Sequence, residues 1–338
     1  MRPRSAVKLA LAGSLPERLR SLRDGQAAIR VATVGAALES GVLDALVEPR
    51  TTAALADTLA VTDVRLLEAF LEALEAGRLV RSGPAGHRLT RRGRAVLADD
   101  VVRAAYEGFS GYHTGLYRDL PVQLRGGPAR SDIARHGDVI ARLSRAFEPL
   151  VHDALAAEVE RLRPARVLDV GCGDGTNLEH ILRAAPEAEG TGVEVDAVAA
   201  RMAQERLARA DLADRGRVLA MDVRGLLADP ARLGGPVDLA LLANVVYYLP
   251  AAERSDFLHD VAALVRPGGT VMVVSTVAEP SAFSRHFDLL LRAQEGEMSL
   301  PTARDLAGYL AAAGLEVTGA RRLTPGDPLH AVTGRRRG

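Results

Sequence analysis

Three glycines on alternate positions, placed just after a short apolar run, carry the clearest chemical signal in this chain. The run Arg166–Val170 contains Asp169, and Gly171, Gly173 and Gly175 follow it before a segment with helical spacing. Glycine lacks the Cβ atom that keeps backbone away from a ligand, so a strand, a glycine turn and a helix predict close contact with a nucleotide-like molecule. The G-x-G-x-G spacing differs from the dinucleotide pattern G-x-G-x-x-G.

Polar side chains also follow the next three apolar runs. Glu194 ends the second run and lies near the spacing of about 20 residues expected for an acid that holds ribose hydroxyls. Asp222 ends the third run, where its carboxylate can accept a hydrogen bond from an adenine amine. Asn244 follows the fourth run, Val237–Leu242. The carboxyl ends of successive parallel strands meet in one crevice, so these side chains are expected to converge there.

This arrangement resembles the class I S-adenosylmethionine-dependent methyltransferases. In that family the glycine loop faces the methionine end of the cofactor, the acid after strand two holds the ribose, and the acid after strand three reads the adenine. Arg266–Gly269, before the strand Thr270–Ser275, matches the family's turn into strand five. The resemblance implies S-adenosyl-L-methionine (SAM) as the cofactor, held by Asp169, Gly171, Gly173, Gly175, Glu194, Val195, Asp222, Val223 and Asn244.

The first hundred residues have a different pattern. Gln26–Leu46 is apolar and predicts a buried helix followed by a short one, with a break at Gly41. Capping residues and apolar periodicity then predict two further helices, a hairpin and a third helix. The hairpin strands are expected at Leu79–Arg81 and His87–Leu89, and Thr90 is expected to cap the last helix. Helix, turn, helix and hairpin together are typical of a winged helix.

A winged helix raises the question of DNA binding. Its second helix would enter the groove, yet it carries Glu68, Glu72 and Glu75 against the single cation Arg65. Affinity for phosphates depends on cationic side chains, so this face is unfavourable, although the predicted hairpin is basic. We favour self-association of this domain over DNA binding.

The whole chain resembles small-molecule O-methyltransferases that join a winged-helix dimerisation domain to a class I catalytic domain. The resemblance implies an α/β protein and a homodimer, with a mainly helical winged-helix domain over 1–98 and a Rossmann-like seven-stranded sheet over 164–338. Residues 99–163 are expected to form a helical linker that contributes to the substrate pocket. Leu315–Leu323 and His330–Thr333 are expected to form a terminal antiparallel hairpin.

The linker contains two further patterns. Apolar residues from Ile140 to Leu155 recur at helical intervals and predict one long helix. Five of the six tyrosines fall in two clusters, Tyr106–Tyr117 and Tyr247–Tyr248. Amphipathic rings suit the wall of a pocket for a flat acceptor, but the first cluster is equally consistent with helix packing in a core.

The residues that would remove a proton from the acceptor are the least defined. Many O-methyltransferases of this group have a His-Asp pair after strand four, with the histidine as base, whereas this chain has Tyr247 and Tyr248 there. A tyrosine with a pKa of about 10 is a poor base, so these rings are expected to orient the acceptor. Three explanations stay open: an acceptor that needs little help, another base, or transfer driven by proximity.

Other histidines are weaker candidates. His286, on an expected helix over the carboxyl edge of the sheet, is a candidate base or orienting group together with Tyr247 and Tyr248. His113 is a further candidate, and His152 is expected at the surface because it lies just beyond the apolar stripe of its helix. No set of His, Cys and Asp residues has metal-ligand spacing, so no metal is predicted.

Composition limits the other classes. Forty-three basic and 43 acidic residues balance, so no net field favours nucleic acid or an anionic membrane. No apolar run reaches the roughly 18 residues of a membrane span. The single cysteine, Cys172, and the weak apolar start of Met1–Ala10 favour a cytoplasmic protein without a secretory signal. A base-flipping methyltransferase of nucleic acid is disfavoured, because neither proline of the Asn/Asp-Pro-Pro-aromatic turn follows Asn244.

The sequence therefore predicts a SAM-dependent methyltransferase that acts on a small, aromatic or polyketide-like metabolite in natural-product tailoring. Oxygen is the favoured accepting atom, with nitrogen and carbon as alternatives. Two other classes stay open: an enzyme that keeps the cofactor fold but catalyses a cyclisation or a hydroxylation, and a winged-helix transcriptional regulator that senses SAM.

Overall fold

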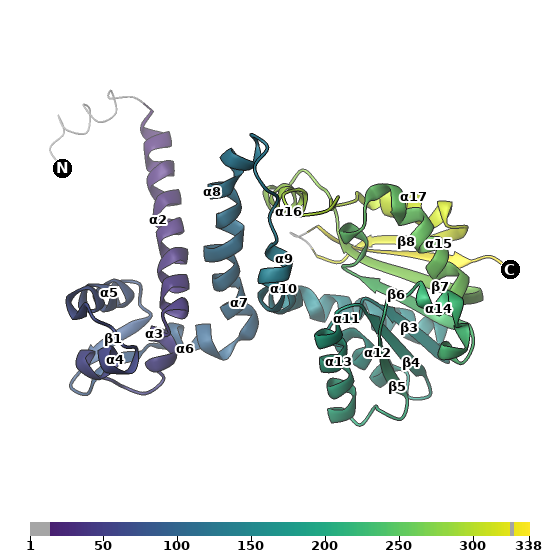
Figure 1. The fold of residues 1–338 in the computed structure, drawn as a ribbon, viewed down its shortest axis with the longest axis horizontal. Coiled ribbons are helices and arrows are strands. Elements are labelled where there is room, and N and C mark those ends of the chain that lie inside the picture. The colour runs from purple at the N-terminus through teal and green to yellow at the C-terminus, as the bar shows by residue number, and fades with distance from the viewer. Residues whose placement is uncertain (1–13, 325–327) are drawn as a thin grey trace. The chain divides into compact units, whose positions relative to one another are not determined.

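The structure of the protein is a computed structural model that describes residues 14–324 and 328–338 (Figure 1). The expectation about Met1–Ala10 falls outside the described residues. The chain forms two compact units. The first comprises the described residues up to Gly126 together with Asp132–Ala146, and the second comprises Gly127–Ser131 and Phe147–Gly338. The segment 99–163 that the sequence groups as one linker is thus divided between the two units.

The first unit is mainly helical, with one small hairpin. Thr51, Asp63 and Thr90 begin its α4, α5 and α6, and each side chain accepts a hydrogen bond from a backbone N–H of the first turn. The predicted order of two helices, a hairpin and a helix is present, while the winged-helix classification stays a prediction. The elements are α2 (Leu15–Glu39), α3 (Val42–Ala45), α4 (Thr52–Thr58), α5 (Val64–Ala76), β1 (Val80–Gly83), β2 (Gly86–Leu89), α6 (Arg91–Ala98), α7 (Asp100–Gly108), η1 (Phe109–His113), α8 (Thr114–Gln123), α9 (Asp132–Arg135) and α10 (Gly137–Ser144).

The long first helix corrects one expectation. The sequence predicts a buried helix from Gln26, but α2 begins at Leu15 and only Val34, Gly35, Ala37 and Leu38 near its end are buried. The predicted break is correct, because Gly41 has a φ of 73°, which glycine adopts without a Cβ clash. Most of α2 therefore has an accessible surface that includes apolar side chains.

The second unit is built on a seven-stranded sheet in the order β5-β4-β3-β6-β7-β9-β8. All neighbours are parallel except β9, which runs antiparallel to β7 and β8 and forms the predicted terminal hairpin. Strand β6 is buried over almost its whole length, as expected for a parallel strand covered on both faces. The strands are β3 (Arg166–Val170), β4 (Glu189–Glu194), β5 (Gly216–Ala220), β6 (Val237–Ala243), β7 (Val265–Thr276), β8 (Leu315–Arg322) and β9 (Leu329–Arg336).

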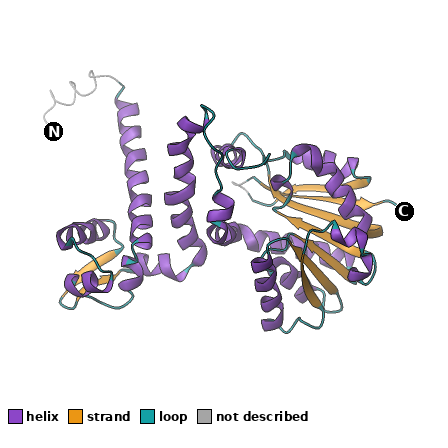
Figure 2. Cartoon of the chain, in the orientation of Figure 1, coloured by secondary structure: helices purple, strands orange, loops and turns teal. Residues whose placement is uncertain are grey.

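Helices cover both faces of this sheet (Figure 2). Leu155 of α11 and Ile181 of α12 pack on one face, and Phe257 of α15 and Leu310 of α17 pack on the other. The predicted α/β fold class with its seven-stranded sheet is confirmed. The helices are η2 (Arg145–Phe147), which spans the boundary of the units, α11 (Glu148–Leu162), α12 (Thr176–Ala184), α13 (Ala197–Arg209), α14 (Gly225–Ala228), η3 (Pro230–Leu233), η4 (Val246–Tyr248), η5 (Ala251–Glu253), α15 (Arg254–Leu264), α16 (Ala282–Arg292) and α17 (Ala303–Ala312).

The single long helix predicted from Ile140 to Leu155 is wrong. Helix α10 ends at Ser144, a short 3-10 turn follows, and α11 begins at Glu148 with Pro149 in its first turn. Proline has no backbone N–H and fits the first turn of a helix better than its interior, so it begins α11 here. Apolar spacing alone continues smoothly across this break. None of the helices in the described ranges is long and apolar enough to cross a membrane.

Candidate active site

The three glycines of the loop after β3 all adopt the left-handed region, with φ values of 66°, 54° and 81° for Gly171, Gly173 and Gly175. A Cβ on Gly171 would lie 2.6 Å from Val245, and one on Gly175 would lie 2.9 Å from Ala203. These two glycines are needed for both backbone conformation and packing. A Cβ on Gly173 would have no heavy atom within 4 Å, so the middle of the loop faces open space.

Glu194 lies against this loop, as its spacing predicts. Its carboxylate accepts a hydrogen bond of 2.9 Å from the N–H of Gly173 and another of 3.0 Å from the N–H of Asp196. The strand pairing positions it, because the N–H groups of Gly171 and Cys172 both donate to the carbonyl of Val193. The carboxyl end of β4 and the glycine turn are therefore one structural element.

Asp169 is the most unusual polar group of the site. Its side chain is only 1% exposed, and neither carboxylate oxygen has a hydrogen-bond partner among the described residues. Burial, reinforced by the negative charges of Glu194 and Asp174, raises the pKa of Asp169 to about 7. A buried carboxylate without partners is costly, so this position favours a ligand that brings a positive charge or hydrogen-bond donors.

The third acid of the loop is already neutralised. Asp174 forms an ion pair of 2.7 Å with Arg206 and accepts a hydrogen bond of 2.8 Å from the hydroxyl of Thr176. Burial opposes its ionisation, but these partners hold the pKa of Asp174 below its ordinary value. Asp174 thus has partners within the protein, whereas Asp169 on β3 has none among the described residues.

Asn244 and Asp222 follow strands β6 and β5, which are separated in the sheet by β3 and β4. Asn244 has a φ of 59°, and its buried Oδ1 atom has no hydrogen-bond partner within the described part of the chain. Asp222 is exposed and accepts a hydrogen bond of 2.8 Å from the N–H of Arg224. Val195 is exposed beside Glu194, whereas the side chain of Val223 packs in the core.

The tyrosine pair lies in the 3-10 turn η4 that follows Asn244. The rings of Tyr247 and Tyr248 lie 4.6 Å apart, and Tyr247 packs edge-on against Phe287 of α16 at 5.6 Å. Burial raises the pKa of Tyr248, so its phenol stays protonated at neutral pH. The expectation that the pair orients the acceptor stays a prediction.

His286 lies on α16 near the same cluster of rings. Its ring lies 6.4 Å from that of Phe283, which in turn stacks on Phe287. Burial lowers the pKa of His286, so the imidazole is neutral at pH 7 and able to accept a proton.

Two other histidines are engaged elsewhere. The rings of His152 on α11 and His180 on α12 stack at 4.0 Å, and burial lowers the pKa of His152. The surface position expected for His152 is therefore wrong, because α12 covers this side of α11. His113 is buried in the first unit, where its ring contacts those of Phe109 and Tyr112.

A histidine–glutamate pair at the carboxyl edge was not predicted. Glu279, just past the end of β7, bonds to His330 at the start of β9 over 3.0 Å, and it also pairs with Arg322 of β8. These residues are far apart in the sequence and belong to no local motif. Only the pairing of β7 with β9 brings them together, and no signal in the sequence specified that register.

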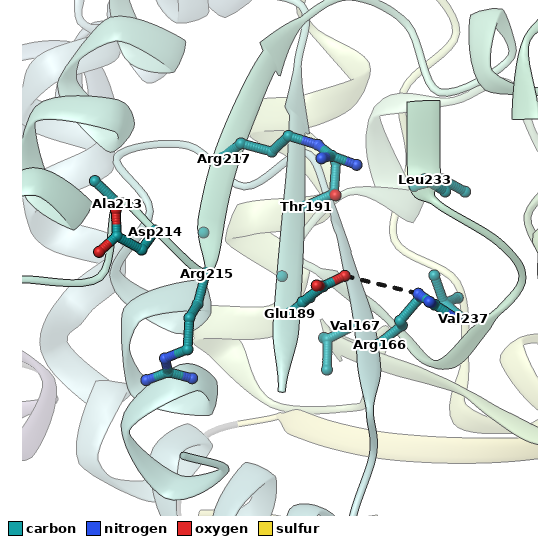
Figure 3. Close-up of a pocket in the computed structure, with 12 residues that line it drawn as sticks. Arg166, Val167, Glu189, Thr191, Ala213, Asp214, Arg215, Arg217, Leu233 and Val237 are labelled. Carbon is teal, nitrogen blue, oxygen red and sulfur yellow. Dashed lines mark ion pairs between the residues drawn. The ribbon is translucent and has the colours of Figure 1, made fainter. Parts of the chain in front are cut away.

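A cavity of about 170 Å³ lies at the opposite, amino edge of the sheet (Figure 3). The first residues of β3, β4, β5 and β6 line it, and Arg166 and Glu189 face each other across it as an ion pair of 3.8 Å. None of the predicted site residues lines this cavity, so it is separate from the glycine loop.

Comparison with known proteins agrees with this geometry. A family model described as "Methyltransferase domain" matches residues 139–319, which is more than half of the chain. The fold and the loop define a class I methyltransferase, a class whose cofactor is SAM. The chain belongs to this methyltransferase-domain family, and the predicted resemblance and cofactor are confirmed.

Curated relatives include two Streptomyces proteins. The 3-hydroxy-5-methyl-1-naphthoate 3-O-methyltransferase of Streptomyces sahachiroi is 32% identical over 127 residues, which are 38% of this chain and 35% of that protein. The aclacinomycin 10-hydroxylase of Streptomyces purpurascens is 30% identical over 194 residues, which are 57% of this chain and 47% of that protein. The region of similarity thus covers less than half the length of each of these two curated relatives.

Solved structures match over almost the whole chain. Mitomycin 7-O-methyltransferase superposes with a TM-score of 0.74 at 22% identity and covers 98% of this chain and 99% of its own. Human N-acetylserotonin methyltransferase, solved in complex with SAM, gives a TM-score of 0.71 at 16% identity and covers 96% and 99%. At these identities the likeness establishes the fold.

Proposed function

We propose that this protein transfers a methyl group from SAM to the oxygen of a small, aromatic or polyketide-like metabolite in natural-product tailoring; nitrogen and carbon are the alternative accepting atoms. The observation that carries the proposal is the buried carboxylate of Asp169, which has no partner among the described residues and lies behind a glycine loop with open space at Gly173. SAM fits this position because its methionine end carries the positive charge that such a carboxylate favours. When bound, SAM supplies a methyl group on an electrophilic sulfonium.

The proposed cofactor contacts follow the ends of the strands. Asp169 faces the cationic methionine end, and the Gly171–Gly175 loop allows close approach of backbone. Glu194 exchanges part of its present hydrogen bonding for the ribose hydroxyls, and Asp222 accepts from the adenine amine. Asn244 offers its unpaired Oδ1 atom beside the reacting end.

On the acceptor side we propose Tyr247, Tyr248 and His286. The protonated phenol of Tyr248 can donate a hydrogen bond and thereby orient an acceptor oxygen. The ring of Tyr247 is only 5% exposed and packs with Phe287, and we propose that a flat substrate binds beside this apolar cluster. Binding in this way positions the acceptor and excludes water, and such positioning supplies on the order of 7–11 kcal/mol in favourable reactions.

A second candidate function has specific support. One relative is named a 10-hydroxylase, and this chain has tyrosines where many O-methyltransferases carry a His-Asp pair. An enzyme that retains SAM but catalyses hydroxylation or another non-methylating reaction is therefore the alternative.

We also propose a homodimer formed through the first unit. Leu19, Leu22 and Ile29 of α2 are 46%, 61% and 66% exposed and recur with the spacing of a helical seam. An apolar groove that includes Leu66 and Phe70 lies in the same unit and reaches Ala36 of α2. A second copy would cover both surfaces. Leu22→Glu is expected to increase the monomer fraction in light scattering, and an unchanged dimer would exclude this surface.

Methyl-labelled SAM tests the function directly. The protein is incubated with labelled SAM and, separately, with 1-hydroxy-2-naphthoate, an aminophenol and an extract of a natural-product producer. Label in a product supports methyl transfer, and mass spectrometry then identifies the accepting atom. Tight binding of SAM in calorimetry without label transfer to any acceptor would favour the non-methylating alternative. Failure to bind SAM would contradict both.

A further inference from the structure

The pair formed by Glu279 and His330 has the features of a catalytic dyad. The Nε2 atom of His330 lies 3.0 Å from the carboxylate of Glu279, and the two side chains are only 14% and 20% exposed. Arg322 also pairs with Glu279. Partial burial opposes ionisation of Glu279, but Arg322 and His330 hold its pKa below the ordinary value. Glu279 is therefore a carboxylate at neutral pH.

The charge of Glu279 determines which nitrogen of His330 is available. A carboxylate only accepts hydrogen bonds, so Nε2 carries the hydrogen and donates it to Glu279. In the neutral ring, Nδ1 then has the free lone pair. A carboxylate behind an imidazole fixes its tautomer and stabilises the imidazolium that forms when the ring takes a proton.

The sheet places this pair at the same edge as the cofactor loop. His330 is paired with Ser275 of β7, one position beyond Val274, whose carbonyl accepts the N–H of Asn244 at the end of β6. Neighbouring strands are about 4.8 Å apart, so His330 is two strands, or about 10 Å, from Asn244. A flat bicyclic or tricyclic molecule spans a distance of this order.

The dyad is also connected to the tyrosine cluster. Ala278, which precedes Glu279, packs in one cluster with Tyr247, Tyr248 and Phe287. The N–H of Glu279 donates to the hydroxyl of Ser284 in the first turn of α16, the helix that carries His286. The dyad and the proposed acceptor-binding rings therefore belong to one packed region of the second unit.

We infer that His330, oriented by Glu279, is the general base that removes the proton from the acceptor hydroxyl. The inference rests on the proposed methyl transfer and names a residue for the role that the tyrosines after β6 leave unfilled. The hydroxyl proton passes to Nδ1 of His330 while the acceptor oxygen bonds to the methyl carbon, and the carbon–sulfur bond breaks with its electron pair on sulfur. The imidazolium later releases the proton to water.

His286 is the competing base, and the two differ in their surroundings. Burial lowers the pKa of His286, which weakens it as a base. His330 instead has the carboxylate of Glu279 at 3.0 Å, which orients its ring. If His330 is the base, His330→Asn lowers the rate and His286→Asn does not, and the reverse is expected if His286 is the base.

Kinetics with labelled SAM and 1-hydroxy-2-naphthoate separates them. His330→Asn is expected to lower kcat by about 10²–10⁴-fold and to remove the acidic limb of the pH profile, with the KM for SAM unchanged. Glu279→Gln is expected to lower kcat less. His259→Asn, at an exposed position of α15, is the matched control that retains wild-type kinetics. An unchanged rate and pH profile in His330→Asn, or a loss confined to His286→Asn, would overturn the inference.

A second readout does not depend on turnover. Nitrogen-15 spectra of the histidine rings, with His330 assigned from its loss in His330→Asn, are expected to show the Nε2–H tautomer in the wild type and a changed tautomer balance in Glu279→Gln. An Nδ1–H tautomer in the wild type would contradict the dyad. If the wild-type protein binds SAM but methylates no acceptor, the proposed function fails, and the tautomer still decides whether the dyad exists.

Discussion

Two aspartates at opposite edges of the same sheet have contrasting environments. At the amino edge, Asp238 accepts hydrogen bonds of 2.8 Å from the N–H groups of Ala165 and Arg166, and it forms an ion pair with Arg266. Burial opposes ionisation of Asp238, but these partners hold its pKa below the ordinary value. At the carboxyl edge, Asp169 has no such partner among the described residues, and its pKa is raised to about 7. The first acid stabilises the fold, whereas the second is available for a ligand.

The same contrast extends along β4. Glu189, at the amino end, is exposed and pairs with Arg166, while Glu194, at the carboxyl end, bonds to the backbone of the glycine loop. In our proposal, the amino ends of the strands carry residues that maintain structure, and the carboxyl ends carry residues that bind the cofactor. Substitutions made in matched pairs at the two edges test this separation.

The largest effect on stability is expected at the amino edge. Asp238→Ala leaves two backbone N–H groups without their acceptor and removes a charge-assisted bond to Arg266. The expected loss is about 3 kcal/mol of unfolding free energy, measured by urea denaturation. Asp169→Asn, at the other edge, removes a buried charge but no hydrogen bond among the described residues, and it is expected to preserve or increase stability. A comparable loss in both variants would remove the distinction between the two acids.

The next effect concerns affinity for the cofactor. Glu194→Ala is expected to weaken SAM binding by about 1.5–3 kcal/mol, because it removes the proposed charge-assisted contact to the ribose. Calorimetry measures the change. Glu189→Ala, at the other end of the same strand, is the control and is expected to bind SAM like the wild type. Unchanged affinity in Glu194→Ala would place Glu194 outside the site.

The raised pKa of Asp169 predicts how pH acts on the free protein and on binding. Between its ordinary pKa of about 3.8 and about 7, the folded protein retains a proton that the unfolded chain has released, so stability falls as pH rises through this interval. A cationic ligand favours the ionised form. SAM affinity is therefore expected to rise up to about tenfold per pH unit from pH 5.5 to 7, with release of a proton. Affinity that is flat or falls over this range would contradict the role of Asp169.

The smallest expected effect is on acceptor orientation. Tyr247→Phe and Tyr248→Phe remove one hydroxyl each. Each is expected to lower kcat by an amount that corresponds to roughly 1 kcal/mol of activation free energy, with little change in SAM affinity. Steady-state kinetics with the acceptor found in the labelling experiment measures this. Tyr309→Phe, on α17 beside Arg254, provides a control outside the cluster. Wild-type kinetics in both cluster variants would identify these tyrosines as core residues.

The sequence predicts the features that depend on local spacing. The glycine turn, the acids after β4 and β5 and the terminal hairpin follow from apolar runs and turn residues, because each is specified within about 20 residues. The structure adds what depends on tertiary contact. Apolar periodicity continued across the turn at Arg145–Phe147, and the exposure of α2 and the stacking of His152 on His180 depend on which helices become neighbours.

The Glu279–His330 pair shows most clearly that local spacing does not predict a tertiary contact. The two residues are 51 positions apart, and their contact depends on the register of β7 against β9. The sequence around Glu279 and the sequence around His330 each look like the end of an ordinary strand. The burial of Asp169 without partners was likewise not predictable, because it depends on the packing of three neighbouring strands.

Titration of SAM into Asp169→Asn and Asp238→Asn, side by side with the wild type, tests the central claim most directly. Both variants replace one aspartate of the same sheet by its neutral isostere, so they differ only in the edge that is changed. The account predicts that SAM binds the wild type and Asp238→Asn with similar affinity and binds Asp169→Asn at least tenfold more weakly, without pH dependence between 5.5 and 7. Equal affinity for both variants, or no binding of SAM to the wild type, would contradict it.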